Sequence, residues 1–195
     1  MATISLSLDE IYKLANKTLL ANGCDQETAD ILSELITNAE RDGSLSHGLF
    51  RLPAYVSGLK SGKINGKQKP NIKKLTPSVI KADGKNCLAP VVLNKSIPEL
   101  VKAAKENGVA VLAIINSHHM AAMWPETEKI ADEGLVAFAC TSYKPAVAPA
   151  GAIKPLFGTN PISFAWPRKN NTPVVYDMAS FNGYGGSTSC KKRGT

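Results

Sequence analysis

Residues 45–52, "LSHGLFRL", contain one of the three histidines of the chain, and Arg51 follows His47 by four residues. An imidazole titrates close to neutral pH and can give or take a proton at a reacting centre. A guanidinium can hold a carboxylate through two parallel hydrogen bonds. If the chain turns helical after Gly48, Arg51 comes round near His47, and Ser46 can orient the ring. The segment therefore indicates acid–base chemistry on an anionic group, with an exposed helix-terminal turn as the alternative interpretation.

The other two histidines lie in "NSHHMAAMWPE", between an apolar run (109–115) and a helical pattern. In α/β sheets, ligands bind at the carboxyl ends of strands. The two alanines leave room for a flat ligand, and a helix N-terminus at this point would offer unpaired N–H groups to a phosphate. We interpret His119 as a functional residue at the strand end. Met123 and Trp124 are better explained as core residues.

Several common sites are missing from the sequence. No G-x-G-x-x-G lies between a strand and a helix, so a standard Rossmann cofactor site is unsupported, and neither a P-loop nor a G-x-S-x-G motif occurs. The adjacent His118 and His119 point in different directions, and the four cysteines form no CxxC pair, so we expect no metal site. Scattered cysteines of this kind favour free thiols in a reducing cytosol, and hence a cytoplasmic protein. No apolar run is long enough for a membrane span.

The formal net charge of +7 is unevenly distributed. Lysines cluster between residues 60 and 74, in a stretch without acidic residues. A nucleic-acid-binding surface would interleave aromatic residues or arginines with these lysines, and they are absent. We interpret the cluster as a solvated basic face, with attraction of anionic substrates or cofactors as the alternative.

The remaining sequence predicts the elements that must position these residues. Two helical patterns occupy the first forty residues, the first capped by the S-x-x-E box of Ser7 and the second by Asp25. A third helix is expected to begin near Pro53, because proline is tolerated in a first helical turn. From about residue 72, strand and helix signals alternate. We expect strands over 78–84, 109–115, 135–141, 161–167 and 173–179, and helices over 96–108 and 119–133.

These patterns indicate an α/β fold, with a small N-terminal helical domain (1–70) and a mixed α/β domain (71–180). The continuous apolar run 109–115 predicts a strand buried on both faces. Residues 181–195 hold no aliphatic side chain and many Gly and Ser, so a disordered tail is expected. Because the last predicted strand runs into this tail, we expect a C-terminally truncated or frameshifted chain.

Three segments carry a resemblance to a known family: "GSLSHGLFRLPAYVSGLKSGKIN", "INSHHMAAMWPETEKIADEGLVAF" and "PAGAIKPLFGTNPISFAWP". The first resembles the "SHG…R-L-P-Y" signature of the malate/L-lactate dehydrogenase-like oxidoreductases, which use nicotinamide cofactors without a Rossmann fold. The other two resemble the reductases of Δ1-piperideine-2-carboxylate and Δ1-pyrroline-2-carboxylate, which reduce cyclic imino acids with NADPH. The resemblance covers roughly residues 5 to 180. It implies a non-Rossmann, mixed α/β NADPH-binding domain that is incomplete at the C-terminus.

The resemblance implies a role for each matching residue. His47 would be the proton donor with Ser46 as its charge-relay neighbour, and Arg51 and Thr159 would bind substrate. In related dehydrogenase branches the histidine matching His119 has the acid–base role, so it is a second catalytic candidate. The aspartate that completes the relay in the family matches about position 187, which is a serine here. The cofactor-binding residues would be His119, Met120, Ala121, Ala122, Met123, Asp177, Met178 and Ala179.

The leading hypothesis is an NADPH-dependent reductase of cyclic 2-imino acids, with NAD possible as cofactor. The first alternative is a 2-hydroxy-acid dehydrogenase of the malate/L-lactate type. The second is a catalytically inactive fragment, and it rests on the sequence after Ser180. The resemblance also implies a homodimer, with a small-molecule substrate and no nucleic-acid or membrane partner.

Overall fold

The computed structural model describes residues 4–118 and 121–180. The predicted tail 181–195 and two site candidates, His119 and Met120, lie outside these residues. The chain divides into two compact units, Met1–Ala121 and Ala122–Thr195. Each unit has one three-stranded sheet and its own cluster of buried side chains.

The first unit begins with the two helices that the sequence predicts, α1 (Leu8–Ala21) and α2 (Gln26–Arg41). The Ser7 hydroxyl accepts the Glu10 N–H while the Glu10 carboxylate accepts the Ser7 N–H, which completes the predicted capping box. Asp25 caps α2 by accepting the Thr28 N–H at 2.9 Å. Two short 3₁₀ turns, η1 (Leu45–His47) and η2 (Leu49–Arg51), then lead into α3 (Leu52–Lys60), which has proline in its first turn as predicted.

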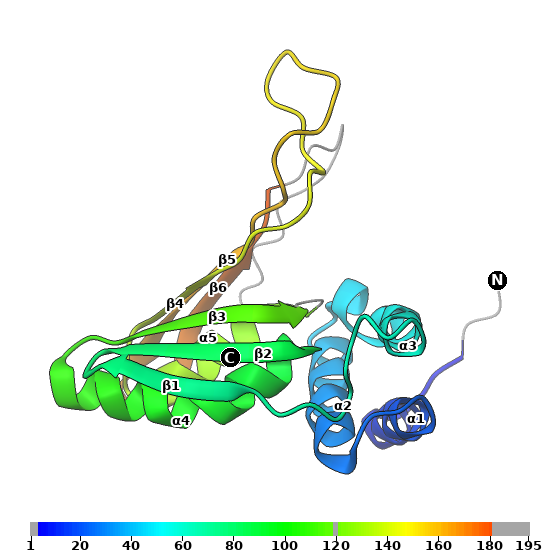
Figure 1. The fold of residues 1–195 in the computed structure, drawn as a ribbon, viewed down its shortest axis with the longest axis horizontal. Coiled ribbons are helices and arrows are strands. Elements are labelled where there is room, and N and C mark those ends of the chain that lie inside the picture. The colour runs from blue at the N-terminus through cyan, green and yellow to red at the C-terminus, as the bar shows by residue number, and fades with distance from the viewer. Residues whose placement is uncertain (1–3, 119–120, 181–195) are drawn as a thin grey trace. The chain divides into compact units, whose positions relative to one another are not determined.

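The sheet of the first unit has the order β1-β2-β3, with β1 (Asn71–Thr76), β2 (Val79–Leu88) and β3 (Val111–His118). β1 and β2 are antiparallel, whereas β2 and β3 are parallel and are connected by α4 (Ala89–Asn107). Figure 1 shows α4 lying along one face of this sheet. Side chains from α1, α2, α3, β2 and α4 form one buried cluster, so the helices and the sheet share a core.

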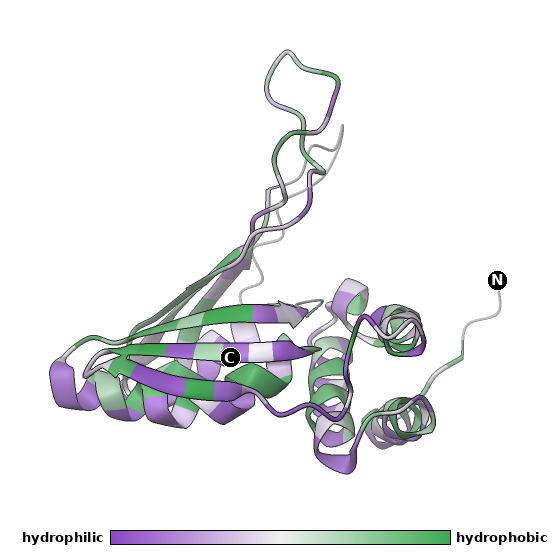
Figure 2. Ribbon diagram, viewed as in Figure 1, coloured by the Kyte–Doolittle hydropathy of each residue, from purple (hydrophilic) through white to green (hydrophobic). Residues whose placement is uncertain are grey.

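Two elements of this sheet region differ from the prediction. β1 was not expected, because its residues are largely polar and exposed and carry no apolar alternation, as the hydrophilic colours of Figure 2 show. α4 begins at Ala89 rather than near residue 96, and Pro98 lies inside it instead of in its first turn. Val91 and Val92 are buried and extend the helix toward its N-terminus. Proline inside a helix removes one hydrogen bond, and here tertiary packing outweighs that loss.

The prediction that the apolar run 109–115 is buried on both faces was wrong. β3 is an edge strand whose side chains alternate, with Leu112 and Ile114 half-buried and Val111 and Ile115 exposed by 55% and 39%. Hydropathy states which side chains favour burial, but the position of a strand in its sheet and the helices packed on it decide which faces are covered.

The second unit is an antiparallel sheet with one helix. Its sheet has the order β4-β5-β6, with β4 (Ala137–Cys140), β5 (Ile162–Arg168) and β6 (Asn171–Met178). α5 (Trp124–Asp132) packs on all three strands and buries Ala131 against Ala137 and Ala165. The three strands were predicted to within a few residues, whereas α5 begins at Trp124 rather than near residue 119. Residues 141–161 form a long ribbon that projects from the ends of β4 and β5 (Figure 1), closed by a bridge between Val147 and Phe157.

The architecture is the mixed α/β fold that the sequence indicates. The structural division at Ala121/Ala122 differs from the expected domain boundary at 70/71. The N-terminal helices share a core with β2 and α4, so they group with the first sheet and not by themselves. None of the helices in the described ranges is long and apolar enough to span a membrane.

Candidate active site

The segment Ser44–Arg51 is shaped by two consecutive 3₁₀ turns. The Ser44 N–H donates to the carbonyl of Ala39 at 2.8 Å, and the His47 N–H donates to the carbonyl of Ser44 at 2.8 Å. After Gly48 the second turn closes with a 2.9 Å hydrogen bond from the Arg51 N–H to the Gly48 carbonyl. The chain therefore does turn helical after Gly48, as the sequence predicts, and it carries Arg51 into the start of α3.

The His47 ring is approached by two serine hydroxyls through its Nδ1 atom. Ser46 Oγ lies 3.0 Å from Nδ1, and Ser44 Oγ lies 3.5 Å from the same atom. Which group donates depends on the tautomer, since Nδ1 can be donor or acceptor. If a serine hydroxyl donates to Nδ1, the proton of the neutral ring is on Nε2. Ser44 was not singled out from the sequence; its spacing of three residues from His47 matches one 3₁₀ turn and could have indicated it.

Arg51 and Tyr55 lie one helical turn apart, and both have a buried polar atom without a hydrogen-bond partner among the described residues. These atoms are the Nε of Arg51 and the hydroxyl of Tyr55. Burial raises the pKa of Tyr55 to about 12, although the nearby Arg51 charge opposes this. Arg51 forms no ion pair with any residue in the described ranges. A cation in this state is available to an anionic ligand.

In the second unit, the Asp177 carboxylate lies at the N-terminus of α5. Its Oδ2 atom accepts the N–H of Met123 at 2.8 Å and the N–H of Trp124 at 2.9 Å. The next residue, Pro125, has no N–H. The prediction that this helix end offers unpaired N–H groups to a phosphate was therefore wrong for these two amides, because a carboxylate from β6 already neutralises the positive end of the helix.

Thr159 lies at the base of the projecting ribbon, close to the end of β6. The Thr159 carbonyl accepts the N–H of Ser180 at 2.8 Å, which joins the "FGTNP" and "DMAS" segments. A side chain at the preceding residue, Gly158, would overlap the backbone carbonyl of Tyr143, so only glycine fits there. On the other side, Asn160 adopts a positive φ of 40° and its side-chain oxygen accepts the Tyr143 N–H at 3.2 Å. These contacts hold the backbone of Thr159.

The structure thus assembles the predicted residues in two groups. Ser46, His47 and Arg51 belong to the first unit. Thr159, Asp177 and the residues after it form a connected group in the second unit, together with Met123. The predicted cofactor residues differ in accessibility: Ala122 and Met123 are buried, Ala121 is half-buried, and Met178 and Ala179 are exposed.

The described cofactor candidates fit only part of a nicotinamide dinucleotide. In the second unit, Ala179 is small and exposed, which suits the approach of a flat, uncharged ring to the backbone. The described candidates offer no cation to the phosphates, and Asp177, the only charged side chain among them, is negative. They therefore suit the nicotinamide end and do not account for phosphate binding. No group of three or more His, Cys, Asp or Glu in the described ranges could hold a metal ion.

The chain is similar in sequence to known proteins. Residues 6–194 match the family model described as malate/L-lactate dehydrogenase. A Δ1-pyrroline-2-carboxylate reductase from Ancylobacter novellus is 39% identical over 191 residues, which are 98% of this chain and 56% of that protein. A (2R)-3-sulfolactate dehydrogenase (NADP(+)) from Chromohalobacter salexigens is 37% identical over 174 residues, covering 89% of this chain and 52% of that protein.

A solved structure gives the same picture. The crystal structure of Δ1-piperideine-2-carboxylate reductase from Pseudomonas syringae pvar. tomato superposes with a TM-score of 0.85 at 41% identity, covering 91% of this chain and 53% of that one. The chain thus spans about half the length of the relatives it matches. The family model covers almost all of the sequence, including both groups of site residues. The chain belongs to the malate/L-lactate dehydrogenase family.

Proposed function

We propose that this chain carries the proton-donating and carboxylate-binding residues of a reductase of cyclic 2-imino acids, such as Δ1-piperideine-2-carboxylate and Δ1-pyrroline-2-carboxylate. NADPH is the proposed cofactor, with NADH possible in its place. The observation that carries the proposal is the pairing of His47 with a serine hydroxyl at 3.0 Å, one 3₁₀ turn before an arginine that has no ion-pair partner among the described residues.

Each residue then has a defined task. Bound NADPH would supply a hydride to the carbon of the C=N bond, giving L-pipecolate or L-proline. His47 donates the proton that the imine nitrogen takes up, while Ser46 holds the ring through Nδ1. Arg51 binds the ring carboxylate in a bidentate manner, and Thr159 also contacts substrate. Relatives named for pyrroline- and piperideine-carboxylate reduction support this substrate class.

A 2-hydroxy-acid dehydrogenase is the second candidate. It is favoured by the similarity to a relative named as an NADP(+)-dependent 3-sulfolactate dehydrogenase. The same residues would serve, with a histidine taking the proton from the alcohol while Arg51 holds the carboxylate. His119 remains the second acid–base candidate for this chemistry.

A side-by-side assay separates these functions. The purified chain is tested for NADPH oxidation with piperideine-2-carboxylate, and for NADP+ reduction with malate, lactate and 3-sulfolactate. Faster turnover of the imine supports the proposal, whereas a preference for a hydroxy acid transfers support to the second candidate. No turnover with any substrate, at high enzyme concentration, identifies the catalytically inactive alternative.

Replacement of the proposed proton donor tests its role. His47→Asn should lower kcat for the imine by about 10²–10⁴-fold, because general acid catalysis contributes about that much. Arg51→Gln should instead act mainly on KM. Equal kcat values for wild type and His47→Asn, at equal thermal unfolding midpoints, would remove His47 from the mechanism.

We also propose that the protein works in the cytoplasm as a homodimer. The free thiols of Cys24, Cys87 and Cys140 support a reducing compartment. The dimer rests on the family resemblance, and light scattering on the purified protein tests it.

A further inference from the structure

Glu40, in the last turn of α2, reaches the junction of the two 3₁₀ turns. Its Oε1 atom accepts the N–H of Leu49 at 2.7 Å, a partly buried hydrogen bond between residues nine apart. Leu49 is the first residue of η2, so its N–H has no partner within that turn. A carboxylate acceptor makes this a charge-assisted bond, which is shorter and stronger than a neutral one.

Gly48 makes room for this carboxylate. A Cβ atom built on Gly48 would overlap the Glu40 carboxyl group, and the three heavy atoms nearest to it all belong to the Glu40 side chain. Gly48 is itself buried. Glu40 therefore occupies the space that a side chain at Gly48, the glycine of the "SHG" segment, would fill.

The junction of the two 3₁₀ turns lies between His47 and Arg51, the two residues that the proposed function uses. His47 ends η1, and Arg51 ends η2. The Gly48 carbonyl, in the peptide unit whose N–H binds Glu40, accepts the Arg51 N–H at 2.9 Å. Rotation of this one peptide would break both hydrogen bonds and change the direction of Arg51 relative to His47.

We propose that Glu40 is a positioning residue, which fixes the orientation of His47 relative to Arg51 through the Leu49 amide. The inference rests on the proposed function only for the chemical roles of those two side chains. Catalytic geometry is sensitive, since a displacement of about 1 Å can cost about 10²-fold in rate. Loss of the Glu40 contact should therefore weaken carboxylate binding much more than it weakens the fold.

The test uses four variants and a matched control in the full chain. Glu40→Ala removes the acceptor, Glu40→Gln keeps an oxygen acceptor, and Gly48→Ala pushes the carboxyl group away. The double variant Glu40→Ala/Gly48→Ala places the added methyl in the vacated space. Glu34→Ala replaces an exposed glutamate on the same helix. The probe is pyrrole-2-carboxylate, a planar and unreducible cyclic carboxylate, with its Kd measured by calorimetry.

Glu40→Ala and Gly48→Ala should each raise the Kd of the probe by about tenfold, the effect of losing about one charge-assisted hydrogen bond between Arg51 and the carboxylate. Glu40→Gln should stay within about threefold of wild type, and Glu34→Ala should not change the Kd. The double variant should bind no more weakly than Glu40→Ala alone, because both changes act through one contact. If Glu40 had a purely structural role, Glu40→Ala would lower the unfolding midpoint. The Kd would then show neither the recovery expected in Glu40→Gln nor the non-additivity expected in the double variant.

The inference is overturned if Glu40→Ala leaves the probe Kd unchanged, or if the two single effects add in the double variant. If wild type binds no probe at all, the proposed function fails instead. The inference is then decided by NMR of the same variants. Changed side-chain resonances of His47 and Arg51 in Glu40→Ala, restored in Glu40→Gln, support it, and unchanged resonances reject it.

Discussion

At the scale of single residues, the start of α3 has two buried polar groups without a hydrogen-bond partner among the described residues. Three buried side-chain polar atoms in the described chain have no hydrogen-bond partner, and two of them, on Arg51 and Tyr55, lie within one helical turn. An unpaired buried polar group costs about 1–3 kcal/mol. Two such groups in one helical turn are typical of a site in which a bound ligand or an ordered water supplies the missing acceptors.

Tyr55→Phe tests this directly. Because the hydroxyl has no partner in the described residues, its removal should leave the free energy of unfolding unchanged or raise it by up to about 1 kcal/mol. Tyr12→Phe is the matched control: the Tyr12 hydroxyl donates to Asp30 Oδ1 at 3.0 Å, so this change should lower stability by about 0.5–1.5 kcal/mol. Urea unfolding measures both. A larger loss of unfolding free energy for Tyr55→Phe than for Tyr12→Phe would mean that the Tyr55 hydroxyl has a hydrogen-bond partner.

At the scale of elements, α5 depends on a cap that comes from a distant strand. Its N-cap residue, Met123, makes no side-chain cap hydrogen bond, and Asp177 on β6 supplies the acceptor instead. The family resemblance predicts Asp177 as a cofactor contact, and that role stays a prediction. In the structure the Asp177 carboxylate joins the start of α5 to the end of β6.

Asp177→Ala should lower the unfolding free energy by about 1–2 kcal/mol, since two helix N–H groups lose their acceptor and the helix dipole loses its anion. Asp177→Asn keeps one oxygen acceptor and should lose about half as much. Asp132→Ala, at the opposite end of the helix, should be neutral or slightly stabilising because it removes an anion from the negative end. Denaturant unfolding compares the three, and equal effects for Asp132→Ala and Asp177→Ala would contradict the capping role.

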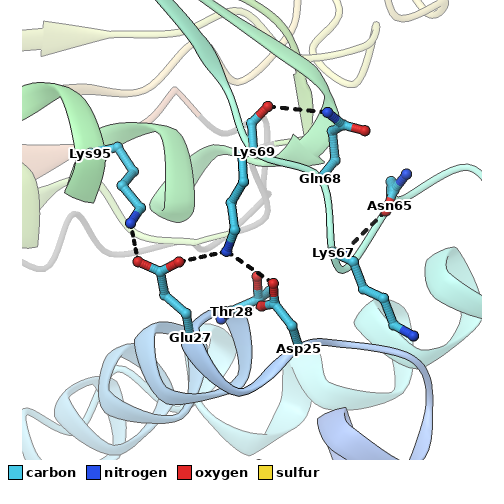
Figure 3. A network of polar contacts seen from close by, with 8 residues as sticks. All are labelled: Asp25, Glu27, Thr28, Asn65, Lys67, Gln68, Lys69 and Lys95. Carbon is cyan, nitrogen blue, oxygen red and sulfur yellow. Dashed lines mark hydrogen bonds and ion pairs between the residues drawn. The ribbon is translucent and has the colours of Figure 1, made fainter.

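At the scale of the whole first unit, an ion-pair network connects the helices to the sheet region (Figure 3). Lys69, which precedes β1, binds Glu27 at 2.5 Å and Asp25 at 2.9 Å. Lys95 from α4 also pairs with Glu27. Hydrogen bonds from Lys69 and Lys95 hold the pKa of Glu27 below its ordinary value of 4.5. Burial raises the pKa of Asp25, but bonds from Lys69 and Thr28 outweigh it, so the net pKa of Asp25 is also lowered.

The lowered pKa values predict acid sensitivity. Carboxylates with a depressed folded-state pKa contribute stability above their ordinary values, 3.8 for Asp25 and 4.5 for Glu27, and lose it as the pH falls through the folded-state values. Lys69→Met should therefore cost on the order of 1 kcal/mol at pH 7, a small amount because the pairs are partly exposed and screened, and much less at pH 3.

Lys67→Met is the control for that experiment, because Lys67 forms no ion pair among the described residues. Urea midpoints at pH 7, 5 and 3 should show a gap between the two variants that closes as the pH falls. A gap that is constant across this range would contradict a role for the paired carboxylates.

Local patterns predicted much of the fold. The capping box of Ser7, the Asp25 cap and the proline at the start of α3 were all readable, because their partners lie within a few residues. β1, the start of α4 and the exposed face of β3 were not. They depend on which segment pairs with β2 and on which face of the sheet α4 covers, and both are set by contacts between residues far apart in the sequence.

The sequence by itself determined the family, the Ser46-His47-Gly48 turn and the position of Arg51 one turn later, since hydrogen bonds between near neighbours in the chain set those conformations. Only the tertiary structure decided that Glu40 occupies the space beside Gly48. It also decided that Asp177 caps a helix 54 residues earlier in the chain. Both contacts join elements that no local pattern brings together, because packing of the core sets the distance between them.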